Sequence, residues 1–447
     1  MSLDEGLFSK LDVLAQEANV IGADGFDVIC SQGKSFSLTA RDGKIDSQKA
    51  SSGQSFGIRV IKNQKVGISY TELADTDALK ACVRKAFDTL NYVDPKEYEK
   101  ILSSKAERLI HDDAKSGAEP IEKKTDLVLD LEKKVFDKDA RVQGCPYNGY
   151  GESVSSSYYL DSNGLQTYES SNYYSCYTSA HMKDGDQQTM YYQSSVAKDF
   201  SGLDVDYCVN ESVEHAKNWL KASPLKSGEY DVLFSTDLLS SLFEAFAGVF
   251  SAKTALDKNN PLFEKYQKTI ASSSLSLMDD PHFDLALGKY VFDSEGSRVA
   301  PLKLIDAGKF SGLLHNSATA EYFNMPNTSR ASRSSKGPLG VSSTNWVIST
   351  GSDKREQLFS GQYFEIVDMQ GLHSGLNFMS GDFSFGASGY LCDGGKRVSP
   401  VKGVTVASNF YKLIKQIKGL TNELNASGSK SFFAPEILFE GLSVAGV

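Results

Sequence analysis

The sequence predicts an α+β protein with several domains: a small amino-terminal α/β domain, a central β-meander with helices, and a β-rich carboxyl-terminal domain. Three observations lead to this prediction. The length of 447 residues is about three times that of a typical domain. Helical and β-rich segments alternate through the first half, and strand-like runs separated by glycine-containing turns dominate the second half. We predict domains at 1–115, 116–225 and 226–447.

In the amino-terminal domain, residues 3–22 are predicted to form a helix, because their apolar side chains recur at three- and four-residue spacing. Short strands are expected at 27–30 and 36–41. Two β-rich runs flank a short turn within 53–70, which predicts a hairpin. A second helix should begin at Asp75–Asp77, whose carboxylates can cap its free backbone amides.

The central domain should follow a polar linker at 91–119, which contains two proline turn signals. A helix is predicted at 121–136. The segment 141–200 is rich in Tyr, Ser and Thr and contains turn signals, which indicates a β-meander. A helix at 206–220 is expected to close this domain.

The carboxyl-terminal domain is predicted to open with a strand at 229–234. A helix at 236–252 should follow, because Thr236 and Asp237 can cap its first turn. Beyond it, strands and turns predominate, and one late helix is predicted at 411–418.

Composition narrows the classes of function. Lys and Arg number 47 and Asp and Glu 57, which gives a net charge of -10. An acidic chain repels phosphates, so direct nucleic-acid binding is not expected. No stretch approaches the roughly 18 apolar residues of a membrane span, and no secretory signal is evident. The six cysteines are widely spread, so reduced thiols and a cytoplasmic location are expected.

The sequence exposes no self-sufficient active site. The six histidines lack the H-E-x-x-H spacing of a zinc site. Ser399 and Lys402 match an S-x-x-K pattern, but the intervening Pro400 and Val401 favour a strand over the helical turn that this pair requires. The segment 389–397 resembles a phosphate-binding loop imperfectly and is better explained as a hairpin turn.

Several segments together resemble the TldD/PmbA family, over nearly the whole chain from about residue 25 to 446. The stretch 242–251 is similar to the helix that carries H-E-x-x-x-H in the TldD branch of that family. The other matching segments are 52–53, 57–60, 293–296, 305–308, 389–396, 400–403, 405–409 and 440–446. Their order and spacing make the resemblance specific.

The resemblance implies two paralogous kinds of chain that pair as a heterodimeric zinc peptidase. In the TldD kind, two histidines and a later cysteine hold zinc, and a glutamate acts on the metal-bound water. The matching positions here are Phe243 and Gly248 for the histidines and Glu244 for the glutamate. The segment 426–430, near the cysteine position, contains no thiol. No metal ligand and no catalytic residue is therefore expected in this chain.

This pattern resembles the PmbA (TldE) branch, the non-catalytic partner. The resemblance implies a chain that pairs with a TldD-type paralogue, which supplies the zinc, and that helps to hold an extended peptide, for example by strand addition. The older description of the family as a modulator of DNA gyrase would then refer to an indirect effect. Asn316, Gly386 and Gly389 are candidates for peptide binding, because the matched segments lie near the family's peptide cleft.

Two other functions stay open at this point. The chain could be an active hydrolase whose metal ligands come from elsewhere, with His282, His315, His373 and Cys392 as candidates. It could also be a peptide-binding scaffold without catalysis. A homodimer is physically reasonable as well, because paralogous pairs often reuse a similar two-fold surface.

Overall fold

The computed structural model describes residues 3–102, 106–114, 119–372 and 374–447. Its helices are α1 (Glu5–Ile21), α2 (Thr76–Thr89), α3 (Ile121–Lys138), α4 (Val205–Trp219), α5 (Thr236–Ala245), α6 (Ala252–Leu256), α7 (Ser317–Phe323), α8 (Arg355–Leu358) and α9 (Phe410–Leu413), with short 3-10 turns η1 (Leu90–Tyr92), η2 (Phe200–Gly202), η3 (Ala247–Phe250) and η4 (Phe263–Lys265). The mixture of helices and several sheets confirms the α+β class.

One long sheet of eight strands occupies the first half of the chain, in the order β3-β2-β1-β6-β7-β4, with β5 and β8 also paired to β7. Its strands are β1 (Gly25–Arg41), β2 (Lys44–Lys62), β3 (Lys65–Thr71), β4 (Arg108–Asp112), β5 (Val142–Gly144), β6 (Asn148–Asp161), β7 (Gln166–Asp184) and β8 (Gln187–Ala197). Strands on both sides of the predicted division at residue 115 thus belong to the same sheet.

The second half of the chain forms a unit with two further six-stranded sheets, in the orders β12-β11-β10-β15-β21-β20 and β18-β17-β16-β9-β22-β19. A pairing of β18 with β22 closes five strands of the latter sheet into a ring. The strands of this unit are β9 (Gly228–Phe234), β10 (Leu277–Asp279), β11 (Leu302–Asp306), β12 (Lys309–Phe310), β13 (Ala331–Ser332), β14 (Gly340–Val341), β15 (Trp346–Ile348), β16 (Gln362–Gln370), β17 (Asp382–Asp393), β18 (Lys396–Asn409), β19 (Ile417–Leu420), β20 (Asn425–Ala426), β21 (Phe432–Ala434) and β22 (Ile437–Ala445).

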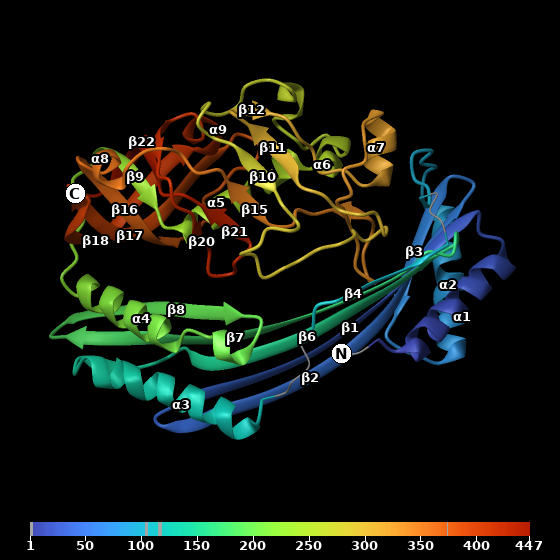
Figure 1. Cartoon of the computed structure of the whole chain (residues 1–447), viewed down its shortest axis with the longest axis horizontal. Coiled ribbons are helices and arrows are strands. Elements are labelled where there is room, and N and C mark those ends of the chain that lie inside the picture. The colour runs from blue at the N-terminus through green and yellow to red at the C-terminus, as the bar shows by residue number, and fades with distance from the viewer. Residues whose placement is uncertain (1–2, 103–105, 115–118, 373) are drawn as a thin grey trace.

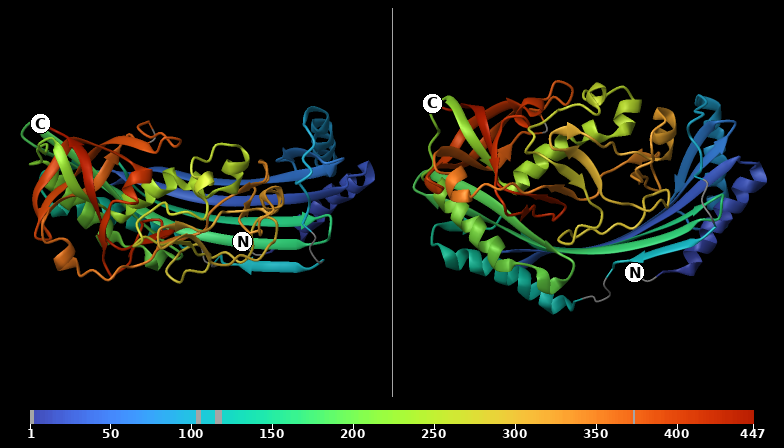
Figure 2. Two further views of the ribbon diagram at one scale, coloured as in Figure 1. Left: turned by 90° about the horizontal axis from the view of Figure 1, so that it is seen from above. Right: turned by 45° about the horizontal axis from the view of Figure 1, so that its top comes forward.

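The long sheet curves, and the carboxyl-terminal unit lies on its concave side (Figure 1). Figure 2 shows the same arrangement from two other directions, with the strands of the long sheet running beneath the loops of that unit. Successive side chains of β1 point to opposite faces of the sheet, so the two faces have different partners. Phe26, Val28 and Cys30 pack with α1 and α2 in an apolar core, whereas Asp27 points to the other face and pairs with Arg333 of the carboxyl-terminal unit.

Most predicted elements of the first half are confirmed, and two are corrected. The strands expected at 27–30 and 36–41 are a single long strand, β1, which pairs with β2 and β6 on its two sides. The predicted linker 91–119 contains β4, which pairs in parallel with β7. Short polar strands such as β4 depend on a partner from elsewhere in the chain, which local sequence does not reveal.

Two predicted helices of the second half are shorter than expected. The helix predicted at 236–252 ends at Ala245 and continues as η3, where the Asn260 side-chain amide donates to the carbonyl of Val249 at 2.8 Å. The helix predicted at 411–418 is only the one-turn α9, after which β19 pairs with β22. Among the helices that the structure describes, none combines the length and apolar composition that crossing a bilayer requires.

Candidate functional site

Phe243 occupies a place in the aromatic core of the carboxyl-terminal unit. It lies on α5, and its side chain is buried. Its ring meets those of Trp346 and Phe410 edge to face, with centroids 6.4 and 5.3 Å apart. Phe432 packs against it as well, at 5.7 Å. The position that the resemblance assigns to a metal-binding histidine is therefore filled by apolar packing.

Gly248 lies beyond the end of α5, within η3. A Cβ atom at this position would lie 2.8 Å from Cζ of Phe378, closer than real Cβ contacts. Phe378 is held in place by Phe246, with the two rings stacked at 6.3 Å. A histidine at position 248 would require this ring to move. The residues at 243 and 248 thus do not fit the zinc ion that the resemblance implies for the TldD branch.

Glu244 lies on α5, and the segment 426–430 contacts the first turn of the same helix. Glu244 is exposed, and its carboxylate accepts a hydrogen bond from Ser240 Oγ at 3.1 Å. The backbone amide of Gly428 donates to the carboxylate of Asp237, in the first turn of α5, at 2.6 Å. The fold thus brings together the two segments that the resemblance links to metal binding, although they carry no zinc-ligand set.

Two of the three residues predicted to bind peptide, Asn316 and Gly389, have structural roles in the fold. Asn316 is buried and forms the N-cap of α7, where its side chain accepts from the Thr319 amide at 2.8 Å. Gly386 and Gly389 lie on β17. A Cβ at Gly389 would fall 1.9 Å from the carbonyl oxygen of Glu365 on the neighbouring strand, so this glycine is required by strand packing.

Of the four residues considered as alternative metal ligands, the three that the structure describes do not together form a metal site. His315 is buried beside Thr319, and burial lowers the pKa of its imidazole to about 4. Cys392 is buried in a different apolar cluster, and burial raises the pKa of its thiol to about 12. His282 is exposed, and His373 lies outside the described residues. Among the described residues, no group of three or more His, Cys, Asp or Glu side chains could hold a metal ion.

A polar pocket that the sequence did not indicate lies between the long sheet and the loop at 288–290. We call it the serine-lined pocket. Its volume is about 340 Å³. It is lined by Ser31, Gln32, His111, Asp113, Ser155, Ser156, Ser157, Glu169, Ser170, Ser171, Tyr173, Gly288, Lys289 and Tyr290.

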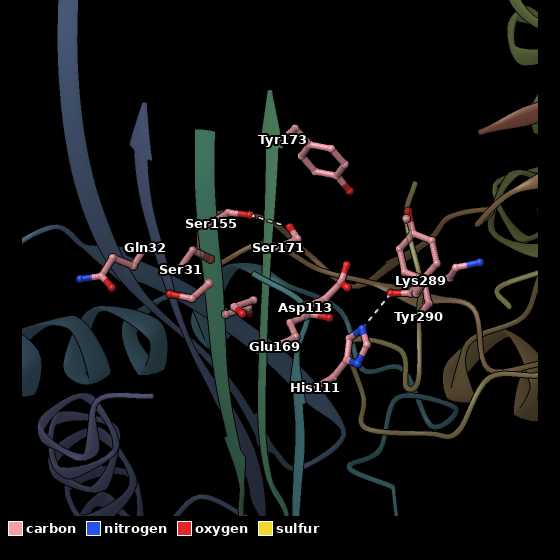
Figure 3. A pocket seen from close by; sticks show the side chains of 14 residues that line it. Ser31, Gln32, His111, Asp113, Ser155, Glu169, Ser171, Tyr173, Lys289 and Tyr290 are labelled. Atoms are coloured by element: carbon pink, nitrogen blue, oxygen red, sulfur yellow. Dashed lines mark hydrogen bonds between the residues drawn. The ribbon is translucent and has the colours of Figure 1, made fainter. Parts of the chain in front are cut away.

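Strand register explains how these residues meet (Figure 3). Ser31 pairs with Ser157, and Ser157 pairs with Glu169, so these side chains share the concave face of the sheet. His111 of β4 lies next to Glu169 in the parallel pair β4–β7, and its Nε2 donates to the Lys289 carbonyl at 3.1 Å. The pocket is thus built by four strands and one loop of the carboxyl-terminal unit.

Local sequence gave little signal for this pocket. His111 and Asp113 fall in the segment predicted to be a linker, so the local sequence predicts no strand there. The remaining signal is the alternation on β7, where Glu169, Ser171 and Tyr173 share one face. Recognising the pocket also requires the pairing of β7 with β4, and that pairing depends on the tertiary fold.

Comparison with known proteins shows which family this chain belongs to. Three family models, described as PmbA/TldA metallopeptidase domain 1, central domain and C-terminal domain, match residues 26–89, 115–220 and 227–446. Metalloprotease PmbA of Escherichia coli O157:H7 is 23% identical over 98% of this chain and 96% of its own. The Metalloprotease PmbA homolog of Haemophilus influenzae is also 23% identical, over 89% of this chain and 87% of its own.

A solved structure shows the same fold. TldE from Thermococcus kodakarensis superposes with a TM-score of 0.83 at 21% sequence identity, covering 98% of this chain and 100% of that chain. The family models together span most of the sequence, in the order expected for domains of one protein. This chain belongs to the PmbA/TldD family of metallopeptidases.

Proposed function

We propose that this chain is the PmbA/TldE-like subunit of a TldD/TldE-type zinc metallopeptidase complex. In this proposal a TldD-type partner holds the zinc ion and cleaves the peptide, and the present chain helps to bind it. The observation that carries the proposal is the packing at positions 243 and 248. Phe243 is surrounded by aromatic rings, and the ring of Phe378 lies against Gly248.

An open strand edge supports a role in holding extended peptides. Along β2, residues 44–55 pair with β1 on one side, whereas β3 pairs only with residues 56–62 on the other. Among the described strands, none covers the second edge of 44–55, and most of these residues are exposed. A peptide can add to such an edge through backbone hydrogen bonds.

The proposal is tested by purifying this chain alone, a TldD-type chain alone, and the two after co-expression. We expect the two chains to co-elute, zinc to be found at one equivalent per heterodimer, and peptide cleavage to require the partner. Replacement of the partner's metal-binding histidines should abolish cleavage. Stoichiometric zinc together with peptide hydrolysis by this chain alone would contradict the proposal, as would failure of the two chains to associate.

Glu244→Gln tests directly whether this chain contributes a catalytic residue to the complex. In this proposal no metal ion is bound beside Glu244, whose carboxylate bonds to Ser240, so Glu244 has no polarised water to activate. We expect the heterodimer with this variant to cleave peptides at the rate of the unmodified heterodimer. Loss of cleavage by a factor of a hundred or more, which is the contribution typical of a general base, would assign Glu244 a catalytic role.

A further inference from the structure

The floor of the serine-lined pocket is formed largely by short serine side chains of the sheet. Ser155 and Ser171 face each other across β6 and β7, with their Oγ atoms 3.1 Å apart. In the same row, Gly33 on β1 pairs with both Ser155 and Gly53 of β2. Hydroxyl groups both donate and accept hydrogen bonds. Such a floor can therefore bind the amide groups of a polypeptide in either orientation.

The hollow is long enough for an extended segment. The serine-lined pocket shares Ser31 and Gln32 with a second hollow of about 760 Å³, which extends over β1 and β2 as far as Gly53. Together they cross the strands from β2 to β4, five strands that are spaced by about 4.8 Å, or roughly 19 Å in all. An extended chain advances about 3.3 Å per residue, so about six residues span this distance.

One end of the hollow is lined by the carboxylates of Asp113 and Glu169 and by Lys289, whose ammonium group donates to the Phe283 carbonyl. The two carboxylates differ in their partners. Asp113 is already paired with Lys198, whose ammonium nitrogen also lies 4.6 Å from the centre of the Tyr173 ring. The Glu169 side chain has no hydrogen bond or ion pair among the described residues, and burial raises its pKa. Figure 3 shows Glu169 close to Asp113, with Tyr290 on the opposite side of the pocket. A cation beside Glu169 would meet a carboxylate and aromatic rings, as Lys198 does at Asp113.

We propose that the serine-lined pocket and the adjoining hollow over β1 and β2 together bind a peptide segment of about six residues, and that Glu169 receives an ammonium group of this peptide. The ammonium belongs either to a lysine side chain or to the amino terminus, since both present the same charge and donors. The inference rests on the proposed function for the kind of ligand. It adds a specific site and a preference for a positive charge, and it concerns this chain without its partner.

Binding to the purified chain alone tests the inference separately from pairing with a TldD-type partner. Three fluorescently labelled hexapeptides serve as probes: one acetylated with a single lysine, one acetylated with norleucine in its place, and one without lysine but with a free amino terminus. We expect the lysine peptide or the free-amine peptide to bind at least about tenfold more tightly than the norleucine peptide. The peptide that binds more tightly identifies the source of the ammonium.

Glu169→Gln should remove this preference, so that all three peptides bind as weakly as the norleucine peptide does. Glu264→Gln is the matched control, because Glu264 is an exposed carboxylate outside the pocket, and it should leave the preference unchanged. Ser155→Phe, which places a ring on the floor, should weaken binding of every peptide.

Equal binding of all peptides to the unmodified chain, no binding at all, or an unchanged preference in Glu169→Gln would overturn the inference. The comparison of lysine with norleucine needs no variant protein and stays decisive if a variant is unstable.

Discussion

At position 243 an aromatic side chain packs in the core, where the resemblance would place a metal-binding histidine. Phe243 is surrounded by Trp346, Phe410 and Phe432, so truncation should leave a cavity among rings. We expect Phe243→Ala to lower the free energy of unfolding by about 3–5 kcal/mol, measured by urea denaturation. The adjacent exposed Glu244→Ala should change it by about 0.5 kcal/mol or less. A small effect of Phe243→Ala would mean that this position is not part of a tight core.

His315 provides a test of stability against pH. Burial lowers the pKa of its imidazole to about 4 in the folded state, whereas the unfolded value is about 6.5. Between these values the unfolded chain binds the proton and the folded chain does not. The contribution of this residue to stability is therefore complete above pH 6.5 and decreases as the pH falls toward 4, by about 3 kcal/mol in total.

We expect His315→Gln to show a flatter dependence of unfolding free energy on pH between 4 and 6.5 than the unmodified chain, measured by denaturation at a series of pH values. Thr319→Val is the control, because it removes the hydroxyl beside the ring but keeps the imidazole. It should lower stability and preserve the slope. An unchanged slope in His315→Gln would show that this imidazole is not the group that titrates in this range.

At the scale of elements, two glycines of β2 differ in how closely the carboxyl-terminal unit approaches them. A Cβ at Gly57 would lie 1.7 Å from the carbonyl oxygen of Ser335, whereas a Cβ at Gly53 would meet nothing within 4 Å. The two residues are four apart on one strand and therefore share a face. We expect Gly57→Ala to destabilise the protein by about 1–3 kcal/mol or more through overpacking.

Gly53→Ala should be neutral or stabilising by up to about 1 kcal/mol, because the residue fits and the unfolded chain loses freedom. Thermal unfolding of both variants measures the difference, and hydrogen exchange should show faster opening near Ser335 only in Gly57→Ala. Equal effects of the two substitutions would show that the loop carrying Ser335 does not press on β2.

Local sequence predicts well those elements that are determined by nearby residues. For α1 and α2, apolar periodicity indicates the helix, and an aspartate cap, Asp4 or Asp75, fixes its start. The elements that were predicted wrongly depend on residues far away in the sequence. β4 and β19 exist because β7 and β22 pair with them, and α5 ends where the Asn260 side chain binds the following carbonyls. None of these partners is visible in the local pattern.

For the whole molecule, the resemblance indicated the family, which the family models confirm. It also predicts which positions correspond to the metal ligands of the TldD branch, because that prediction depends on residues at fixed places in one segment. It did not indicate the serine-lined pocket. That pocket requires the register of four strands and the approach of the loop at 288–290. A one-residue shift in the register of β7 would turn Glu169 to the opposite face of the sheet, so only the assembled fold defines this site.

A buried ion pair joins the long sheet to the carboxyl-terminal unit. Arg333 donates to the carboxylate of Asp27, which also accepts from Arg59 Nε at 2.7 Å, and all three residues are buried. Removing one member of a buried pair leaves charge without compensation, which typically costs about 3–5 kcal/mol. We therefore expect Arg333→Ala to loosen the two parts of the molecule, seen as a lower unfolding free energy and faster hydrogen exchange in β1 around Asp27.

Lys336→Ala is the control for this prediction, three residues along the same loop. Lys336 pairs with Glu72, but both side chains are about half exposed or more, at 47% and 63%. Exposed ion pairs are screened by water and contribute at most about 1 kcal/mol. If Arg333→Ala were no more damaging than Lys336→Ala, the two parts would be held by apolar packing and backbone contacts. The Asp27 cluster would then not determine how the carboxyl-terminal unit sits on the sheet.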